Sequence, residues 1–268
     1  MALCGRNGVL PRDRHRLYQL AVQSPEADVR FMNRVYRGLR DRPAQTLKED
    51  FCGTAALAAE WVRSRRKNRA IGVDLDRRAL DWGRKNNVAP LGDGSSRIRL
   101  IQADVRAVRS PKVDVIAAMN FSYFVFKTRP ELLDYFSNAR ASLAPGGVLV
   151  LDIFGGWEAQ ALETERKPLK GFTYVWEQAR FDPITSETLF HIHFRFKDGR
   201  WMRRAFTYDW RFWTIPEVRE LLRDAGFSRT EVYWEGTETG TGEGNGVFRR
   251  TERIQNCPGW IAYLSATS

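Results

Sequence analysis

Acidic side chains end the first two predicted strands, where they could hold a polar ligand. Glu49 and Asp50 precede a turn that contains Gly53, and Asp74 ends the next strand, 25 residues after Glu49. A glycine-containing turn followed about 20 residues later by an acid is typical of a nucleotide-binding β-α-β unit, in which the acid accepts hydrogen bonds from a ribose. The spacing therefore predicts a nucleoside-binding site.

The turn differs from a dinucleotide-binding turn in its charge and its glycines. Only Gly53 is present where G-x-G-x-x-G needs three glycines, and two carboxylates stand directly before the turn. These carboxylates repel a pyrophosphate and attract a cation. We therefore predict a nucleoside that carries positive charge, and the pattern disfavours a nicotinamide-dependent oxidoreductase.

Two further polar residues, Asp104 and Asn120, follow the third and fourth predicted strands. Because ligands of open α/β sheets bind outside the carboxyl ends of the strands, these residues are expected to converge with Glu49 and Asp74 on one crevice. Buried carboxylates cost several kcal/mol unless they are paired. A bound ligand therefore accounts for them better than the fold alone does.

The elements that would position these residues alternate between strands and helices, which predicts a parallel sheet. Two helices are expected over residues 14–40, the second with Ser24 as its N-cap and Pro25 in its first turn. The helix between the first two strands is expected to begin near Thr54. The predicted parallel strands span residues 47–50, 70–74, 98–102, 113–119 and 147–152.

The pattern changes after residue 155 to aromatic and β-branched residues. It predicts an antiparallel β-meander over residues 172–178, 188–197 and 201–211. A helix over 214–225, ended by Gly226, and two final strands at 231–234 and 260–264, paired as a hairpin, are expected to follow. The Gly/Thr-rich stretch 236–246 between those strands is expected to be a loop.

The sequence Glu49-Asp50-Phe51-Cys52-Gly53-Thr54 resembles the first motif of class I S-adenosylmethionine-dependent methyltransferases, which reads E-x-F-C-G-T-G in some branches. Ala55 stands where a glycine is usual. Segments 98–105, 143–152 and 221–227 resemble later parts of the family pattern, in the same order. The resemblance implies a doubly wound, Rossmann-like α/β fold: a mostly parallel seven-stranded sheet with an antiparallel final hairpin and an inserted antiparallel β-meander.

The resemblance also implies S-adenosyl-L-methionine as cofactor and a role for each acid. Gly53 would let the backbone approach the methionyl part, and Glu49 would face its ammonium group. Asp74 would accept hydrogen bonds from both ribose hydroxyls, and Asp104 from the adenine amine. The cofactor-binding residues expected on this basis are Glu49, Cys52, Gly53, Asp74, Leu75, Asp104, Val105 and Asn120.

The loop after the fourth strand is where this family places residues that face the transferred methyl group. Asn120-Phe121-Ser122-Tyr123 lacks the two prolines of the N-P-P-Y tetrad found in amino-group DNA methyltransferases. Phe121, Phe124 and Phe126 could instead pack in the hydrophobic core without facing a substrate. The residues expected to face the substrate are Phe121, Ser122, Tyr123 and Trp176.

No general base is identified from the sequence, and the candidates are Tyr123, His191 and His193. The two histidines lie two residues apart and therefore share one face of a strand, which is either turned to the pocket or exposed. A neutral amine acceptor needs no strong base, whereas a hydroxyl acceptor would be helped by one. Two histidines on one strand lack a third metal ligand, so no metal site is expected.

The composition indicates a globular protein. Its 268 residues, 43% of them apolar, can form one large core, and no stretch approaches the about 18 apolar residues of a membrane span. Cys4, Cys52 and Cys257 are too scattered for a disulfide framework or a zinc site, and the start has no secretory h-region. A cytoplasmic location is therefore expected.

The expected organisation is an N-terminal helical segment (1–46), a cofactor-binding core (47–155), an inserted meander that serves as a substrate lid (156–211) and a C-terminal part (212–268), together one domain. The leading functional prediction is methyl transfer from S-adenosylmethionine to a small molecule, with N-methylation favoured over O-methylation. The net charge of +11 keeps RNA or DNA methylation as an alternative. A non-catalytic S-adenosylmethionine-binding protein is the second alternative, and the oligomeric state is open.

Overall fold

The computed structural model describes residues 13–109, 111–238 and 244–268, which form two compact units. The smaller unit comprises the described residues up to Ser24 together with Gln160–Phe212, and the larger comprises Pro25–Ala159 and Trp213–Ser268. Cys4 lies outside the described residues. The predictions of a single domain and of a lid role for residues 156–211 stay predictions.

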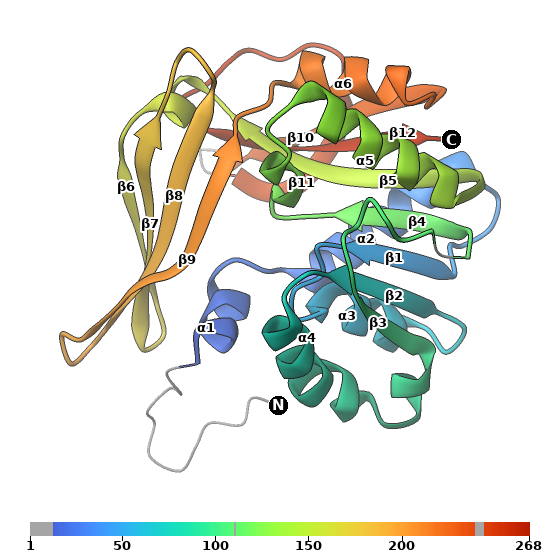
Figure 1. Cartoon of the computed structure of the whole chain (residues 1–268), viewed down its shortest axis with the longest axis horizontal. Coiled ribbons are helices and arrows are strands. Elements are labelled where there is room, and N and C mark those ends of the chain that lie inside the picture. Colours follow the sequence, from blue (N-terminus) through green and yellow to red (C-terminus); the bar gives the residue numbers. More distant parts are fainter. Residues whose placement is uncertain (1–12, 110, 239–243) are drawn as a thin grey trace. The chain divides into compact units, whose positions relative to one another are not determined.

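The larger unit is built on an eight-stranded sheet in the order β11-β10-β12-β5-β4-β1-β2-β3 (Figure 1). Neighbouring strands from β5 to β3 are parallel, and β12, β10 and β11 are added antiparallel at the other end. The strands are β1 (Thr46–Asp50), β2 (Arg69–Asp74), β3 (Ile98–Gln102), β4 (Val113–Ala118), β5 (Leu143–Gly155), β10 (Arg229–Thr237), β11 (Gly244–Thr251) and β12 (Trp260–Thr267).

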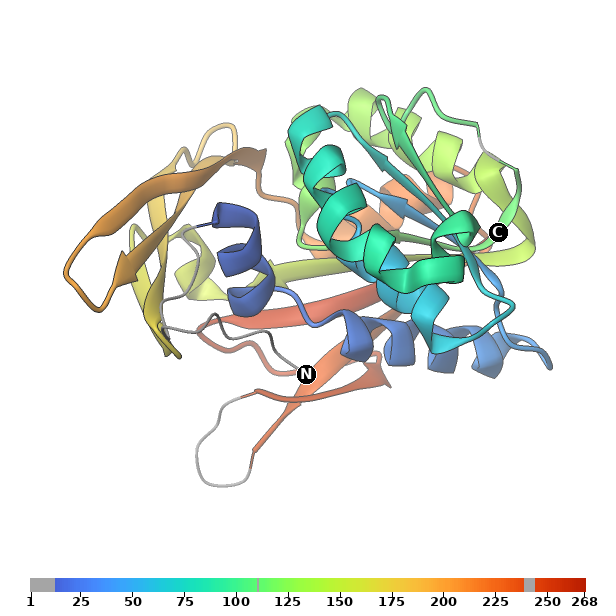
Figure 2. The same cartoon turned by 90° about the horizontal axis from the view of Figure 1, so that it is seen from below.

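Helices cover both faces of this sheet. Figures 1 and 2 show α2 and α3 together on one face and α5 and α6 on the other. Val29, Met32 and Val35 on α2 are buried, as expected for the apolar stripe of a helix that packs on a sheet. The helices are α2 (Pro25–Leu39), α3 (Ala56–Ser64), α4 (Arg77–Gly83), α5 (Arg129–Ser142) and α6 (Ile215–Asp224), with one π-helical turn η1 (Arg84–Val88) and short 3₁₀ segments η2 (Ala89–Arg97), η3 (Ser122–Val125) and η4 (Trp157–Gln160).

The smaller unit consists of α1 (Arg14–Ala21) and a four-stranded antiparallel sheet in the order β6-β7-β8-β9. Leu17 of α1 is buried with Phe172, Ile192 and Phe194 of the sheet. The strands are β6 (Thr164–Leu169), β7 (Phe172–Phe181), β8 (Glu187–Phe196) and β9 (Trp201–Arg211). Three of them confirm the predicted meander.

The predicted fold is confirmed, with three corrections of detail. The sheet has eight strands instead of seven, because β11 forms within and beyond the stretch 236–246 that was predicted to be a loop; residues 239–243 of that stretch lie outside the described residues. β10 pairs antiparallel with both β11 and β12, so β10 and β12, predicted to form the final hairpin, are antiparallel neighbours with β11 between them in the sequence. The first core helix begins at Ala56 instead of Thr54.

Candidate cofactor and catalytic site

β1 brings polar side chains to opposite faces of the sheet, as the alternation of a strand requires. Glu49 faces α3, where its Oε2 accepts a hydrogen bond from the backbone N–H of Ala58 at 2.8 Å. Lys48 and Asp50 lie on the other face and form a fully buried ion pair, with Nζ and Oδ1 2.9 Å apart. Tyr135 donates its hydroxyl to Asp50 at 3.2 Å, so Asp50 is engaged within the core.

Glu49 is an acid whose protonation is strongly affected by its surroundings. Burial raises the pKa of Glu49 to about 8, although the Ala58 hydrogen bond lowers it, and the nearby carboxylates Asp74 and Asp28 raise it further. A positive charge beside Glu49 would restore its ionised form. The surroundings of this carboxylate therefore suit a cationic group.

The turn after β1 holds its backbone in the left-handed region at three positions. Phe51, Gly53 and Ala55 have φ values of 56°, 50° and 55°. Ala55 therefore adopts a conformation that glycine tolerates better, at the place where the family pattern has a glycine. Cys52 is buried between them, and a side chain at Gly72 on the neighbouring strand would come within 2.9 Å of its Sγ. The turn is thus packed directly against β2.

Asp74 links this turn to the start of α4. Its Oδ2 accepts the backbone N–H of Gly53 at 2.6 Å, and its Oδ1 accepts that of Asp76 at 2.8 Å. Burial raises the pKa of Asp74, while these hydrogen bonds lower it in part. Leu75, the next residue, is 68% exposed. The structure thus brings Gly53 and Asp74 together, as the sequence predicts.

Asp104 has a partner that its position in the sequence did not indicate. The guanidinium of Arg106 holds both of its carboxylate oxygens, with Nη2 2.6 Å from Oδ2 and Nε 3.1 Å from Oδ1. This hydrogen bonding lowers the pKa of Asp104, so the group is ionised at neutral pH. Val105 is buried, and its carbonyl accepts from Asn138. A role for Asp104 in adenine binding stays a prediction, and it would require the carboxylate to be shared with Arg106.

The loop after β4 is organised by Asp152, an acid that sequence reasoning did not place in the site. The backbone N–H groups of Asn120 and Phe121 donate to its Oδ2 and Oδ1 at 2.7 and 2.8 Å. Both residues have a positive φ. Burial raises the pKa of Asp152 to about 7 in spite of these hydrogen bonds. The only signal in the sequence was an acid within an otherwise apolar strand.

The side chains of this loop point to different surroundings. Ser122 donates its hydroxyl to the carbonyl of Met119 at 2.7 Å, and Phe121 packs against Phe154. Tyr123 is fully buried, and its hydroxyl has no hydrogen-bond partner among the residues that the structure describes. Burial raises the pKa of Tyr123 well above its usual range, so its hydroxyl stays protonated at neutral pH.

A second acid that sequence reasoning missed is Asp28, in the first turn of α2. Tyr263 on β12 donates its hydroxyl to Asp28 at 2.7 Å, and Tyr263 is the register partner of Asp152 on β5. Burial raises the pKa of Asp28 to about 6. An acid in a first helical turn reads as an ordinary partner of the helix dipole, so its burial could not be inferred from the sequence. Asp28 further raises the pKa of both Glu49 and Asp152 by charge repulsion.

The two histidine candidates lie in the smaller unit, and both are buried on β8. His193 accepts the backbone N–H of Arg204 at Nδ1 (3.0 Å), and its Nε2 lies 2.8 Å from Oε2 of Glu177. A neutral His193 therefore carries its proton on Nε2 and donates it to Glu177. His191 is hydrogen-bonded through Nδ1 to Thr207 at 3.0 Å, and burial lowers its pKa.

Trp176, the remaining substrate-facing candidate, is part of an aromatic cluster within the same unit. Its ring stacks on Phe190 with centroids 4.6 Å apart and lies near the rings of Tyr208 and Trp210. Packing within the sheet accounts for these contacts. Contact with a substrate stays a prediction for this residue.

Comparisons with known proteins identify a related family and fold. Residues 51–147, which include the β1 turn, Asp74, Asp104 and the loop after β4, match the family model described as a methyltransferase domain. No curated protein matches the chain in sequence. Among the described residues, no helix has the length and apolar character needed to cross a bilayer.

Solved structures share the fold along nearly the whole chain. An S-adenosylmethionine-dependent methyltransferase from Clostridium acetobutylicum is similar with a TM-score of 0.66 at 18% identity, covering 94% of this chain and 96% of its own. An amino pentose methyltransferase from Micromonospora echinaspora, with S-adenosylmethionine bound, has a TM-score of 0.66 at 18% identity, with 97% and 98% covered. A sugar N-methyltransferase from Streptoalloteichus has a TM-score of 0.60 at 18% identity, with 98% and 96% covered.

Proposed function

We propose that this chain is a class I S-adenosylmethionine-dependent methyltransferase that methylates an amine nitrogen of a small molecule; the match of residues 51–147 to a methyltransferase domain and the shared fold support this. When bound, S-adenosylmethionine supplies a methyl group on a positively charged sulfur. The acceptor nitrogen would form a bond to the methyl carbon as the carbon–sulfur bond breaks; the electron pair of that bond would stay on sulfur, S-adenosylhomocysteine would leave, and the proton that the nitrogen loses would pass to solvent. Little chemistry is then left to the protein beyond alignment and exclusion of water.

The residues of the larger unit fit this cofactor. Glu49 lies in surroundings that favour a cation beside it, which suits the methionyl ammonium group. Asp74 is fixed by two backbone N–H groups and keeps acceptor capacity for ribose hydroxyls. Gly53 presents backbone without a side chain at the turn. These assignments are proposals, and substitution of the two acids tests them most directly.

The observation that carries the amine proposal is that every candidate for a general base is engaged or buried. Tyr123 has a fully buried hydroxyl that stays protonated. His191 and His193 are held by hydrogen bonds within their own sheet. An amine needs no strong base, whereas a hydroxyl acceptor does. Two of the similar structures, the amino pentose and the sugar N-methyltransferase, are named for such acceptors, which supports the same interpretation.

The test is a methylation assay with matched acceptors. Purified protein and S-adenosylmethionine are incubated with a panel of amino sugars and other small amines, with the corresponding alcohols and with tRNA, and products are identified by mass spectrometry. We expect methylated amines and unchanged alcohols. Methylation of tRNA or of alcohols alone would overturn the proposal.

Histidine variants provide a second measure of the same proposal. Because an amine acceptor needs no base, His191→Gln and His193→Gln should each keep the rate within about tenfold of the parent protein, whereas loss of a general base costs about a hundredfold or more. The rate constant at saturating substrate is the measurement, and circular dichroism checks that the variants are folded. A hundredfold loss in a folded variant would point to an oxygen acceptor.

A further inference from the structure

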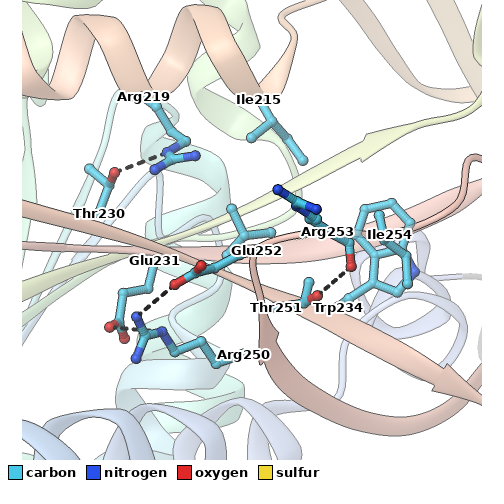
Figure 3. Close-up of a pocket in the computed structure, with 11 residues that line it drawn as sticks. Ile215, Arg219, Thr230, Glu231, Trp234, Arg250, Thr251, Glu252, Arg253 and Ile254 are labelled. Carbon is cyan, nitrogen blue, oxygen red and sulfur yellow. Dashed lines mark hydrogen bonds and ion pairs between the residues drawn. The ribbon is translucent and has the colours of Figure 1, made fainter.

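A pocket of about 380 Å³ lies in the larger unit between α6, β10 and the chain from Arg250 to Ile254 (Figure 3). In the sheet, β10 is separated from β2, which carries Asp74, by β12, β5, β4 and β1. Five strand spacings correspond to about 24 Å. The pocket therefore lies apart from Asp74 at the proposed cofactor site, and its volume lies within the range of small-molecule sites.

Two arginine side chains give this pocket unneutralised positive charge. Arg219 on α6 donates through Nε to Thr230 Oγ1 at 3.1 Å, which fixes its side chain over β10. Figure 3 shows its guanidinium and that of Arg253 facing the same space from opposite sides. Within residues 13–109, 111–238 and 244–268, neither forms an ion pair with a carboxylate. Their donors are available to an anion.

The acids that line the pocket have partners of their own. Glu231 is buried, lies 3.1 Å from Nε of Arg250, pairs with Arg229 and accepts the hydroxyl of Tyr233 at 2.7 Å. Glu252 is 3.4 Å from Nη2 of Arg250. These pairs balance the remaining charge, so the excess positive charge comes from Arg219 and Arg253.

Apolar side chains form the rest of the wall. Ile215, Val232, Trp234 and Ile254 line the same space, and Ile254 is 56% exposed although its side chain is large and apolar. Trp234 packs against Trp260 with ring centroids 4.7 Å apart, which holds its indole in place. A rigid indole next to guanidinium groups suits a planar apolar body that carries a negative charge at one end.

We infer that this pocket binds a small organic anion, a carboxylate or phosphate joined to a planar apolar body, at a site separate from the cofactor crevice. The anionic end lies between Arg219 and Arg253, and the planar body lies along Trp234 and Ile254. Thr230 and Thr251 also line the pocket; Thr230 Oγ1 accepts from Arg219, and Thr251 Oγ1 donates to the carbonyl of Arg253.

The experiment is a calorimetric titration of the full-length protein with phenyl phosphate, phenylacetate, inorganic phosphate and benzyl alcohol at low salt. We expect saturable one-to-one binding of phenyl phosphate or phenylacetate with a Kd of about 1 mM or less. Inorganic phosphate lacks the planar apolar body, and benzyl alcohol lacks the negative charge. Each should therefore bind at least about tenfold more weakly than the aromatic anions. Excess S-adenosylhomocysteine should not displace the aromatic anion. Whichever aromatic anion binds more tightly identifies the acidic group.

The double variant Arg219→Gln/Arg253→Gln should weaken this binding by about a hundredfold, because each guanidinium contributes charge-assisted hydrogen bonds. Arg223→Gln is the matched control: it removes the same charge from α6 at an exposed position that does not line the pocket, and binding should stay within about twofold.

Four results would overturn the proposal: no saturable binding of either aromatic anion, unchanged binding in the double variant, an equal loss in Arg223→Gln, or displacement by S-adenosylhomocysteine. If inorganic phosphate bound as tightly as phenyl phosphate, the inference that the pocket recognises a planar apolar body would be overturned.

Discussion

At the scale of single residues, Asp74 has two functions that can be separated by experiment. It accepts backbone N–H groups from Gly53 and Asp76, and it is the acid proposed to hold the ribose. Asp74→Asn keeps the shape and one acceptor oxygen but loses the charge. We expect cofactor affinity to fall by about a hundredfold, since two charge-assisted hydrogen bonds weaken at about 1.5 kcal/mol or more each. Calorimetric titration with S-adenosylmethionine measures this.

The control for Asp74→Asn is Asp76→Asn. It removes the same charge two residues away, and asparagine replaces aspartate well as the N-cap of α4, the role that Asp76 has in the structure. Cofactor affinity should change by less than about threefold. Equal effects of the two variants would remove Asp74 from the proposed site.

The raised pKa of Glu49 predicts that cofactor affinity depends on pH. Its pKa is about 8 without a cation nearby, so the carboxyl is protonated at pH 6 to 7, whereas a bound ammonium group favours the ionised form. Affinity should therefore rise by up to about tenfold per pH unit as the pH increases toward 8, and then level off. In Glu49→Gln this rise should be absent. A dissociation constant that is independent of pH in the parent protein would contradict the role of Glu49.

At the scale of elements, Asp152 connects β5 to the loop after β4. Asp152→Ala leaves the two N–H groups of Asn120 and Phe121 without their acceptor, and each such group costs about 1–3 kcal/mol when it is buried. We expect the free energy of unfolding to fall by about 2 kcal/mol or more, measured by urea denaturation at pH 6.

Asp224→Ala provides the comparison for Asp152→Ala, because Asp224 forms an exposed ion pair with Arg129. Such pairs contribute about 0–1 kcal/mol, so the loss of stability should be smaller. Similar losses for both variants would show that Asp152 does not hold the loop.

The elements also show what could be predicted from the sequence. β2 and β3 were predicted within one residue, because a short apolar run between polar flanks identifies a buried parallel strand. β6 was missed because Thr164–Leu169 is almost wholly exposed and contains a proline, as befits an edge strand. β11 was missed because its glycines read as a loop, although Phe248 packs against Tyr263.

The candidate site likewise contains residues whose proximity could be predicted from the sequence and residues whose proximity could not. Glu49, Gly53 and Asp74 lie in or beside one β-α-β unit, so their proximity follows from local spacing. Asp28 and Tyr263 are 235 residues apart and meet only through the order of the strands, which a single sequence does not reveal. Arg106 is two residues from Asp104, yet their pairing depends on side-chain geometry that no spacing rule predicts.

At the scale of the whole molecule, the raised pKa values predict that the cofactor-free protein is most stable under mildly acidic conditions. Asp28, Glu49 and Asp152 have folded-state pKa values of about 6, 8 and 7, above their ordinary values near 4. At a pH between the ordinary and the folded-state pKa of such a carboxyl, the folded state binds more protons than the unfolded state. The free energy of unfolding therefore falls as the pH rises, by about 1.4 kcal/mol per pH unit for each carboxyl. His191, with a lowered pKa, acts in the opposite direction below about pH 6.5.

Thermal unfolding between pH 5 and 8 measures this effect. The melting temperature should decrease across the range, and the decrease should be smaller in Glu49→Gln, which cannot ionise. A melting temperature that rises steadily from pH 5 to 8 would contradict ionisation of these buried carboxyls as the cause.

Because Cys52 is buried, the rate at which thiol reagents label it can report how often the turn after β1 opens. Its side chain is 2% exposed and its thiol pKa is raised well above the ordinary value, so reagents react with it only when the turn opens. Cys257 is partly exposed and provides an internal reference in the same molecule. Mass spectrometry of the two labelled peptides therefore reports how often the segment around Gly53 opens, without any assay of turnover.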